Sequence, residues 1–257
     1  MAAILTLGRL NPRISKMLLS PAVRYVLGVI FPVFALAIGL SFYLGYSDLA
    51  AVSFLISFFL VYQLSANLYH RFWSHRQFDL SPNFAKVTSF LGLFAMTGDP
   101  LSFAWTHRWH HMHADTDLDV HSPIHGKFHS FFGWLFKKSP INGPIIDDLF
   151  RPEYRYLLSL SKYKIAIVWV TLILFAFISL KILLGILLAM CCALVLELIA
   201  NTFAHSAEKK QARNVKILAW LAMGSYHYDH HKNAKNIEAN DPGYLLIQSL
   251  KFLNLAK

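Results

Sequence analysis

Four long apolar stretches, separated by polar segments, dominate the chain. They run from about residue 26 to 44, 49 to 68, 165 to 180 and 182 to 203. A helix needs about 20 mostly apolar residues to cross the hydrocarbon core of a bilayer, so each stretch predicts one transmembrane helix. Only Lys181 separates the last two, which predicts a tight helical hairpin. A shorter apolar run, residues 84–96, predicts an interfacial or re-entrant segment, because a crossing there would place neighbouring histidines on opposite sides.

Basic residues are distributed unevenly around these spans. Arg9, Arg13, Lys16 and Arg24 precede the first span, whereas Lys181 is the only basic residue in a predicted outer turn. Loops rich in Lys and Arg stay in the cytoplasm, so both termini and the polar middle of the chain are predicted to be cytoplasmic. Residues 1–20 lack a continuous apolar core before a cleavage site, and we expect this segment to be retained rather than removed as a signal peptide.

Composition narrows the class of protein. Hydrophobic residues make up 56% of the 257 residues and charged residues only 15%, which argues against a soluble enzyme, a disordered chain and a coiled coil. The length predicts a single domain, with residues 115–155 as a loop region. The only cysteines, Cys191 and Cys192, are adjacent, which excludes a disulfide scaffold and a thiolate-bound zinc or iron–sulfur site.

The net charge of +10 fits attraction to anionic lipid head groups. It also predicts a docking surface for an acidic substrate carrier or electron donor. No nucleic-acid-binding module is recognisable, so we expect no nucleic-acid partner. The best candidate for the docking surface is a basic cluster formed by Lys209, Lys210, Arg213 and Lys216.

Histidine is the unusual residue, with 13 copies against 14 for Asp and Glu together. Most histidines fall into groups near the predicted cytoplasmic ends of the spans. Imidazole is a common metal ligand, and nine rings exceed what a single ion can use, so the count predicts a two-metal site. The candidate ligands are His70, His75, His107, His110, His111, His205, His227, His230 and His231, with the amide of Asn201 beside them.

Spacing indicates how these side chains could converge. Residues three and four apart share a helix face, so His107, His110 and His111 could aim at one region, as could the last three histidines of the set. Asn201 and His205 are also four apart. His70 and His75 are five apart, about 140° around an ideal helix. That pair suits two neighbouring metals, or a helix that unwinds between them, better than one metal.

The ligand set favours redox-active iron with oxygen. Zinc hydrolases use about three protein ligands and a nearby Glu base, and no His-Glu-x-x-His pattern occurs. Four further histidines lack partners at ligand spacing, and we expect supporting or solvated-loop roles for them: His113, His121, His125 and His129. Glu197 lies one turn before Asn201, where a hydrogen bond to this candidate ligand would explain an intramembrane carboxylate.

These motifs resemble the membrane fatty-acid desaturase family, in its stearoyl-CoA-type, delta-9 branch. The resemblance covers most of the chain from the second span onward. It is carried by His70-Arg-Phe-Trp-Ser-His75, His107-Arg-Trp-His110-His111, Asp115-Thr-Asp-Leu-Asp-Val-His-Ser-Pro123, Gly133-Trp134, Asn201-Thr-Phe-Ala-His205 and His227-x-x-His230-His231. The chain departs from the family pattern at Met223-Gly-Ser-Tyr226 and at Tyr228, positions that concern substrate handling more than metal binding.

The resemblance implies an all-α integral membrane protein with four transmembrane helices and a cytoplasmic helical cap. It implies two non-haem iron ions held by the nine histidines, with Asn201 bound through a water. The implied reaction uses O2, which is reduced to water, to remove two hydrogens from a saturated acyl chain and leave a cis double bond. The acyl group would be carried by CoA, acyl carrier protein or a lipid, within a kinked tunnel.

Two alternatives stay open at this point. The same oxidant could serve a hydroxylase or an acetylenase, because all three reactions begin by hydrogen abstraction. A non-catalytic metal transporter would need polar residues along its spans, and these are mostly apolar. Electrons would come from a separate donor of ferredoxin or cytochrome b5 type. The small size and lack of a fused cytochrome domain favour a bacterial ferredoxin as this donor, and we expect a bacterial inner membrane rather than the endoplasmic reticulum.

Overall fold

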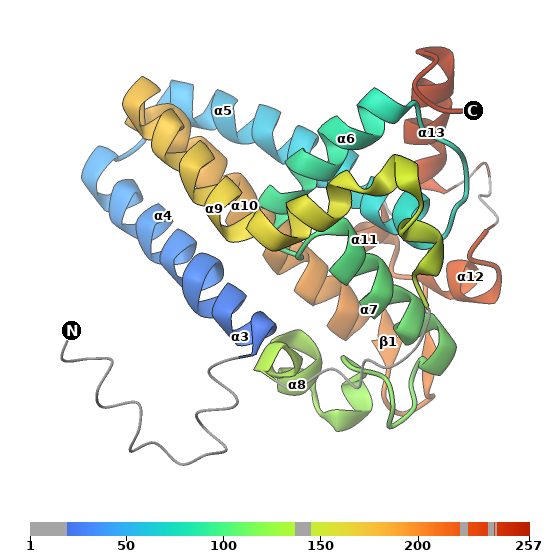
Figure 1. The fold of residues 1–257 in the computed structure, drawn as a ribbon. Helices are drawn as coiled ribbons and strands as arrows, with labels where there is room; N and C mark the ends of the chain where they lie inside the picture. The colour runs from blue at the N-terminus through green and yellow to red at the C-terminus, as the bar shows by residue number, and fades with distance from the viewer. Residues whose placement is uncertain (1–19, 137–144, 222–225, 236–238, 240) are drawn as a thin grey trace.

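The computed structural model describes residues 20–136, 145–221, 226–235, 239 and 241–257, and the chain there is mostly helical (Figure 1). Arg9, Arg13 and Lys16 lie outside these residues. Four helices are long and apolar enough to cross a membrane, which confirms the four predicted spans. Their bounds are Pro21–Leu44, Asp48–Ser74, Pro152–Ile178 and Leu180–Phe203.

The first two spans are longer than the hydrophobic pattern predicts, because their ends contain polar or basic residues. Backbone conformation changes along each, and short 3₁₀- or π-helical segments carry the label η. Gly45, with φ of 62°, makes the turn between the two spans. The first consists of α3 (Pro21–Tyr25), η2 (Val26–Ile30) and α4 (Phe31–Leu44), and the second of α5 (Asp48–Phe58), η3 (Phe59–Ala66) and η4 (Tyr69–Ser74).

The last two spans form the predicted hairpin, α9 (Tyr156–Ile178) and α10 (Leu180–Phe203). The break falls at Ser179, which has an extended backbone and whose Oγ accepts a hydrogen bond from the amide of Ile182. The prediction that Lys181 marks the break was therefore wrong by two residues. The third span also begins well before residue 165, because the apolar pattern misses its amphipathic first turns.

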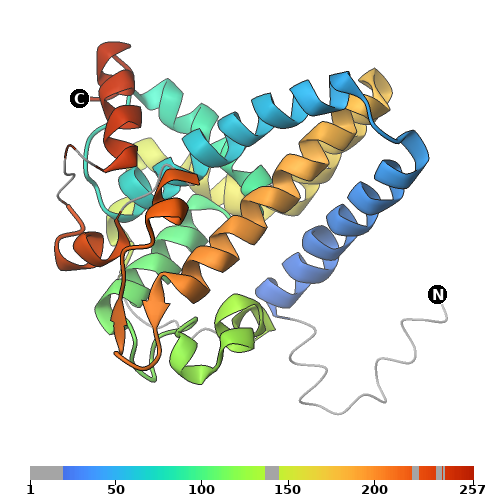
Figure 2. The ribbon, with the colours of Figure 1, turned by 180° about the vertical axis from the view of Figure 1, so that it is seen from behind.

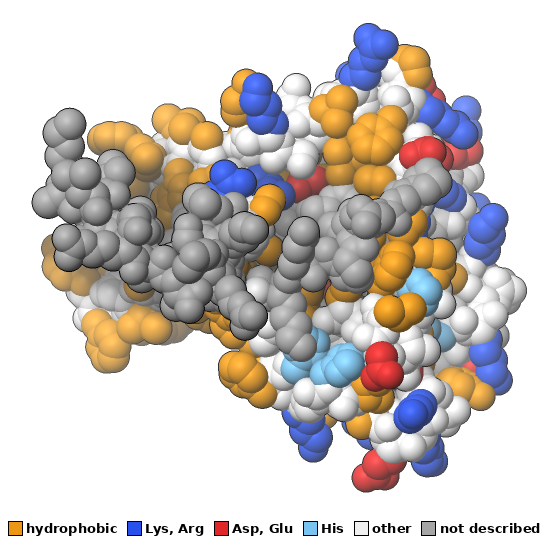
Figure 3. All heavy atoms as spheres, turned by 60° about the horizontal axis from the view of Figure 1, so that its bottom comes forward, with side chains coloured by type: hydrophobic (Ala, Val, Ile, Leu, Met, Phe, Trp, Pro, Cys, Tyr) orange, Lys and Arg blue, Asp and Glu red, His pale blue; other side chains and the backbone are white. Residues whose placement is uncertain are grey.

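Exposed apolar side chains mark the surface that a bilayer would cover. Phe42 and Phe177 are 88% and 86% exposed, and both lie near the end of the spans that is remote from the histidines. Figure 3 shows hydrophobic side chains gathered over one end of the molecule, with most charged side chains and the visible histidines toward the other. Such a large apolar surface is unfavourable in water and fits contact with lipid.

The short apolar run near residue 90 does not make a further span among the described residues. It forms α6 (Pro82–Leu91) and η5 (Gly92–Ala95). Its interfacial location stays a prediction.

The remaining elements gather around one end of the long helices (Figures 1 and 2). Two short strands are the only ones among the described residues, and they form an antiparallel hairpin. The helices are α7 (Pro100–His113), η6 (Pro123–His125), α8 (Lys127–Phe131), η7 (Gly133–Phe136), η8 (Asp147–Leu149), η9 (Pro152–Tyr154), α11 (Lys216–Leu221), α12 (His227–Lys232) and α13 (Pro242–Phe252), and the strands are β1 (His205–Ser206) and β2 (Gln211–Ala212).

Close packing of α5 against α10 depends on Gly185. A Cβ at this position would lie 2.5 Å from the carbonyl oxygen of Ala50 and 2.6 Å from Cβ of Ser53. Ser53 also donates a hydrogen bond from Oγ to the carbonyl of Ile182, at 2.8 Å. Small residues allow this approach of helix backbones, which is a common basis of helix association in membranes.

We expect Gly185→Ala to destabilise the protein, because the obstructing atoms include backbone and the two helices must move apart. Overpacking of this kind costs about 1–3 kcal/mol. Thermal unfolding of the detergent-purified variant should show a lower midpoint. Gly39→Ala is the matched control in α4, since nothing lies within 4 Å of a Cβ there. An unchanged midpoint for Gly185→Ala would contradict the packing argument.

Candidate metal centre

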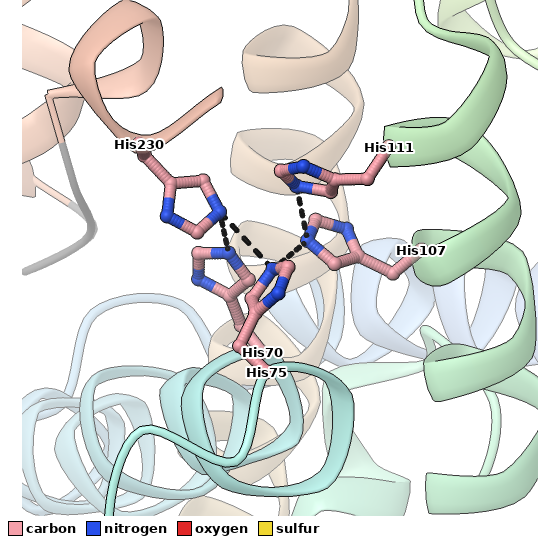
Figure 4. A group of neighbouring side chains, drawn as sticks. All are labelled: His70, His75, His107, His111 and His230. Atoms are coloured by element: carbon pink, nitrogen blue, oxygen red, sulfur yellow. Dashed lines mark hydrogen bonds between the residues drawn. The ribbon is translucent and has the colours of Figure 1, made fainter. Parts of the chain in front are cut away.

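The nine candidate histidines come together in two neighbouring groups at the polar end of the long helices. In each group, all the candidate ligand atoms lie within 4.8 Å of one another. The groups adjoin, since the rings of His111 and His231 stack at 4.1 Å. Site A consists of His70, His75, His107, His111 and His230 (Figure 4), and site B of His110, His205, His227 and His231.

The distances between ring nitrogens suit metal ligands. In site A the Nε2 atoms of His70 and His230 are 2.8 Å apart, and those of His107 and His111 are 3.1 Å apart. In site B, His205 Nε2 lies 2.8 Å from His227 Nε2 and 3.2 Å from His110 Nε2. Metal–nitrogen bonds of about 2.1 Å at right angles would separate two ligand nitrogens by about 3.0 Å.

Hydrogen bonding between the rings cannot account for this arrangement alone. Figure 4 shows the rings of site A turned inward, with the Nε2 atom of His75 close to two others. These are the Nε2 atoms of His107, at 2.8 Å, and His230, at 3.1 Å. A neutral ring nitrogen has either one proton or one lone pair, so it cannot serve two partners in this way. A shared cation satisfies all the lone pairs at once.

His70 and His75 reach the same site because the helix is widened between them. Residues Tyr69–Ser74 form a π-helix, and the amide of His75 donates to the carbonyl of His70 at 3.2 Å. This bond spans five residues, as in a π-turn, and brings residues five apart to one face. The spacing of this pair left two possibilities open, namely two metals or a helix that unwinds. Both rings belong to site A, so two metals are not needed. The helix widens into a π-turn and does not unwind.

The two three-histidine motifs each divide between the sites, contrary to the prediction that each motif aims at one region. In α7, His107 and His111 face site A while His110 faces site B. In α12 the division is reversed, because His227 and His231 face site B while His230 faces site A. Positions four apart stay together because they share a helix face, and the third ring of each motif points to the neighbouring site.

The start of α7 is fixed by a capping box. Asp99 accepts hydrogen bonds from the amides of Leu101 and Ser102, and Ser102 Oγ accepts one from the amide of Asp99. Lys164 of α9 lies 2.6 Å from the same fully buried carboxylate. Burial raises the pKa of Asp99, but the Lys164 charge and the hydrogen bonds outweigh it and hold the pKa below its usual value. This anchors the helix that supplies three ligands.

Arg108, next to His107, joins α7 to the end of η4. Its guanidinium donates to the carbonyl oxygens of Trp73 and Ser74, each at 2.8 Å. It also makes a two-pronged contact with the carboxylate of Asp148, at 2.6 and 3.0 Å. A planar guanidinium suits such paired contacts, and a lysine could not reproduce them. The contacts fix two ligand-bearing helices relative to each other.

Arg71, next to His70, joins η4 to α13. It is fully buried, and its Nη2 lies 2.9 Å from Asp241 Oδ1 at the N-terminus of α13. A Cβ on Gly243 would lie 2.0 Å from this Nη2, so the close approach requires a glycine. Both arginines that neighbour ligand histidines are therefore engaged in contacts that hold helices together, Arg71 fully buried and Arg108 partly so.

Site B depends on a strand and a short helix. His205 begins β1 and pairs with Ala212 of β2. After β2, Asn214 accepts a hydrogen bond from the amide of Tyr228, at 2.8 Å, and donates one to Asp229, at 2.7 Å. These bonds fix the first turn of α12. The ring of Tyr228 lies against the ammonium of Lys232, at 4.2 Å, so this departure from the family pattern is directed away from the ligands.

Two carboxylates that sequence reasoning did not single out support site B. Asp115 Oδ2 accepts a hydrogen bond from His205 Nδ1 at 2.9 Å. Asp119 Oδ2 lies 3.0 Å from His110 Nδ1, although the angle there falls short of a good hydrogen bond. His121, which we expected in a supporting or loop role, is buried beside them, with its ring 4.3 Å from that of His110. The sequence signal for these two carboxylates is the alternation of aspartates at 115, 117 and 119, just after the motif that contains His107, His110 and His111.

Burial keeps the imidazoles in the form that a metal requires. It lowers the pKa of His75 and His111 to about 2 and that of His231 to about 3, with neighbouring histidines adding to the effect. The rings are therefore neutral at pH 7, with a free lone pair. Burial also raises the pKa of Asp119 to about 6, so this carboxylate is mainly ionised at neutral pH.

Other candidates lie outside both groups. His113 packs against Trp109, with ring centres 4.3 Å apart, and His129 Nε2 lies 3.0 Å from the carbonyl of Val120. No hydrogen bond from Glu197 to Asn201 occurs in the described part of the chain, contrary to our hypothesis for this carboxylate. The backbone carbonyl of Asn201 accepts a bond from Ser130 Oγ. Met223, Gly224 and Ser225 lie outside the described residues.

Comparison with curated proteins finds acyl desaturases. A chloroplastic protein of Arabidopsis thaliana, named a probable lipid desaturase, is 40% identical over 95 residues, which is 35% of this chain and 26% of the relative. An acyl-CoA 5-desaturase of Anemone leveillei is 46% identical over 68 residues, covering 26% of this chain and 21% of the relative. A delta-9 acyl-lipid desaturase of Arabidopsis thaliana is 41% identical over 68 residues, covering 26% and 22%.

The resemblance to the fatty-acid desaturases is confirmed. No protein-family model matches the chain. The aligned part spans only about a quarter of the length of the desaturases it matches. The likeness to desaturases therefore supports a family relationship over the aligned part of the chain.

We expect each site to lose its metal separately. His70→Ala removes a donor from site A alone, and His227→Ala removes one from site B alone. Each variant should bind about one metal per chain where the unaltered protein binds about two, measured by elemental analysis of purified protein.

His113→Ala is the control for these substitutions, since this histidine lies in neither group and should leave the metal content unchanged. Loss of both metals from either single variant, with the fold intact by circular dichroism, would mean that the two groups form one inseparable site.

Proposed function

We propose that the protein is an oxygen-dependent acyl desaturase with a non-haem diiron centre, built as a single desaturase domain over residues 1–257. Sites A and B would each hold one iron ion, with Asn201 bound through a water. The observation that carries the proposal is the convergence of nine Nε2 atoms into two adjoining groups. Imidazole suits iron, and similarity to acyl desaturases favours iron over zinc.

A saturated alkyl chain has no acidic or basic group through which a side chain could act. The iron ions would supply the oxidising power for C–H cleavage with O2, which ends as water. The protein's own part is to hold nine rings in position and to exclude water around them. His110, His205 and His230 are at most 4% exposed, which keeps the donors from forming hydrogen bonds with bulk water.

The proposed substrate is a saturated fatty acyl chain carried by CoA, acyl carrier protein or a lipid, converted to a cis double bond. We propose delta-9 regiochemistry from the motif resemblance. The similar proteins are named as delta-5, delta-7 and delta-9 desaturases, so the position of the bond is the property to measure. The long apolar spans support an acyl substrate dissolved in the membrane, because such a chain can approach the centre without crossing water.

We further propose a separate one-electron donor of ferredoxin or cytochrome b5 type. Lys209, Lys210, Arg213 and Lys216 are all exposed, and the first two lie in the turn of the hairpin whose strand β1 begins with His205. Positive charge at this position would attract an acidic donor protein. The positive-inside pattern supports cytoplasmic termini, a cytoplasmic cap and a cytoplasmic centre, and we place the protein in a bacterial inner membrane rather than the endoplasmic reticulum.

Expression in a desaturase-deficient host tests the reaction. Gas chromatography of the fatty acids, with location of the double bond, should show a new monounsaturated acid that disappears with His110→Ala. His113→Ala should retain the product. A main product with an added oxygen would indicate the hydroxylase alternative, and a triple bond would indicate an acetylenase.

Charge reversal tests the docking surface. We expect Lys209→Glu with Lys210→Glu to raise the apparent KM for an acidic ferredoxin several-fold at low salt, because attraction becomes repulsion. The iron content should stay unchanged. Lys251→Glu, at an exposed position near the end of α13, is the control. An unaltered KM at low ionic strength would exclude this surface from donor binding.

A further inference from the structure

Sites A and B differ in what contacts Nδ1 of their histidine rings, the nitrogen that does not face the site. In site B, Asp115 lies 2.9 Å from His205 Nδ1 and Asp119 lies 3.0 Å from His110 Nδ1. Both aspartates are buried, at 4% and 2% exposed. Half of the rings in site B therefore have a carboxylate at the nitrogen that does not face the site, His205 in a hydrogen bond and His110 in a close contact without good hydrogen-bond geometry.

Site A has no such partner in the described part of the chain. No carboxylate there contacts the ring of a site A histidine, and His230 Nδ1 is buried without a hydrogen-bond partner. The two charged pairs near site A, Arg71–Asp241 and Arg108–Asp148, hold helices rather than rings.

A carboxylate at Nδ1 has two effects on a metal-binding imidazole. It holds the proton on Nδ1, which leaves the lone pair on Nε2 for the metal, and it fixes the orientation of the ring. It also makes the ring a stronger donor. Loss of such a partner reduces metal affinity by about 10–100-fold in other proteins.

The loop is built to present these two carboxylates. Asp119 accepts hydrogen bonds from the amides of Asp115, at 3.1 Å, and His121, at 3.3 Å. Asp115 has a φ of 59°, in the left-handed region that Asp and Asn tolerate better than most residues. Asp117, between them, is exposed. The loop thus buries alternate aspartates behind one metal site.

We propose that Asp115 and Asp119 are positioning residues that act on site B alone and make the two metal sites chemically unequal. The inference rests on the proposed diiron function. It predicts that neutralising either carboxylate weakens metal binding at site B and leaves site A unaffected. Asparagine is the suitable replacement, since it keeps the size of the side chain and the tolerance of the left-handed backbone.

The test is an anaerobic titration of the metal-free, full-length protein with ⁵⁷Fe(II), followed by Mössbauer spectroscopy and iron analysis. The signal lost in His70→Ala identifies site A, and the signal lost in His227→Ala identifies site B. We expect Asp119→Asn and Asp115→Asn each to weaken iron binding at site B by about 10–100-fold, with site A unchanged. Asp117→Asn, in the same loop, should change neither.

Several outcomes would overturn the proposal. One is equal weakening of iron binding at both sites, and another is no weakening at either. A third is an additional iron in the unaltered protein that Asp119→Asn removes, which would make His110, Asp119 and His121 a separate metal site. Because the two aspartates act on different rings, one variant tests the proposal if the other fails to fold. Failure of the unaltered protein to bind iron would instead refute the diiron function, and this inference with it.

Discussion

The structure depends on holding nine imidazole rings together, largely withdrawn from water and turned toward two shared points. A buried polar group is costly unless it has a partner, and nitrogen atoms about 3 Å apart cannot all satisfy one another. Without a cation, the cluster would be an unfavourable region in the middle of the fold. The long helices, the loop after α7 and the hairpin β1–β2 hold this arrangement in place.

Charged pairs outside the two groups provide much of that support. Lys164 holds Asp99 at the start of α7, Arg108 ties α7 to the end of η4, and Arg71 ties η4 to α13. Each pair joins segments far apart in the sequence, and each is largely removed from water. A buried pair adds little net stability but is costly to break, so these pairs fix geometry more than they strengthen the fold.

Much of this could be predicted from the sequence. The four spans follow from the apolar pattern, and the nine histidines follow from their spacing. The division between the sites could not be predicted, because it depends on the π-helix around His70 and His75 and on the relative rotation of α7 and α12. The roles of Asp115 and Asp119 could not be predicted either. The sequence shows three alternating aspartates, and only the structure shows that Asp117 is exposed while the other two are buried beside ligand rings. The turn at Ser179 shows the same limit, because a single extended residue leaves almost no mark on an apolar pattern.

That turn, together with the short connection at Gly45, leaves the remote end of the four spans with hardly any polar surface. Among the described residues, the chain emerges there only for the few positions around Tyr46 and for Ser179. A water-soluble molecule therefore has little to recognise on that side beyond Tyr46 and Lys181, which are exposed. An electron-carrying protein and the polar head of a bulky acyl carrier would have to share the opposite face, and unless their footprints are separate, each would compete with the other for access during a catalytic cycle.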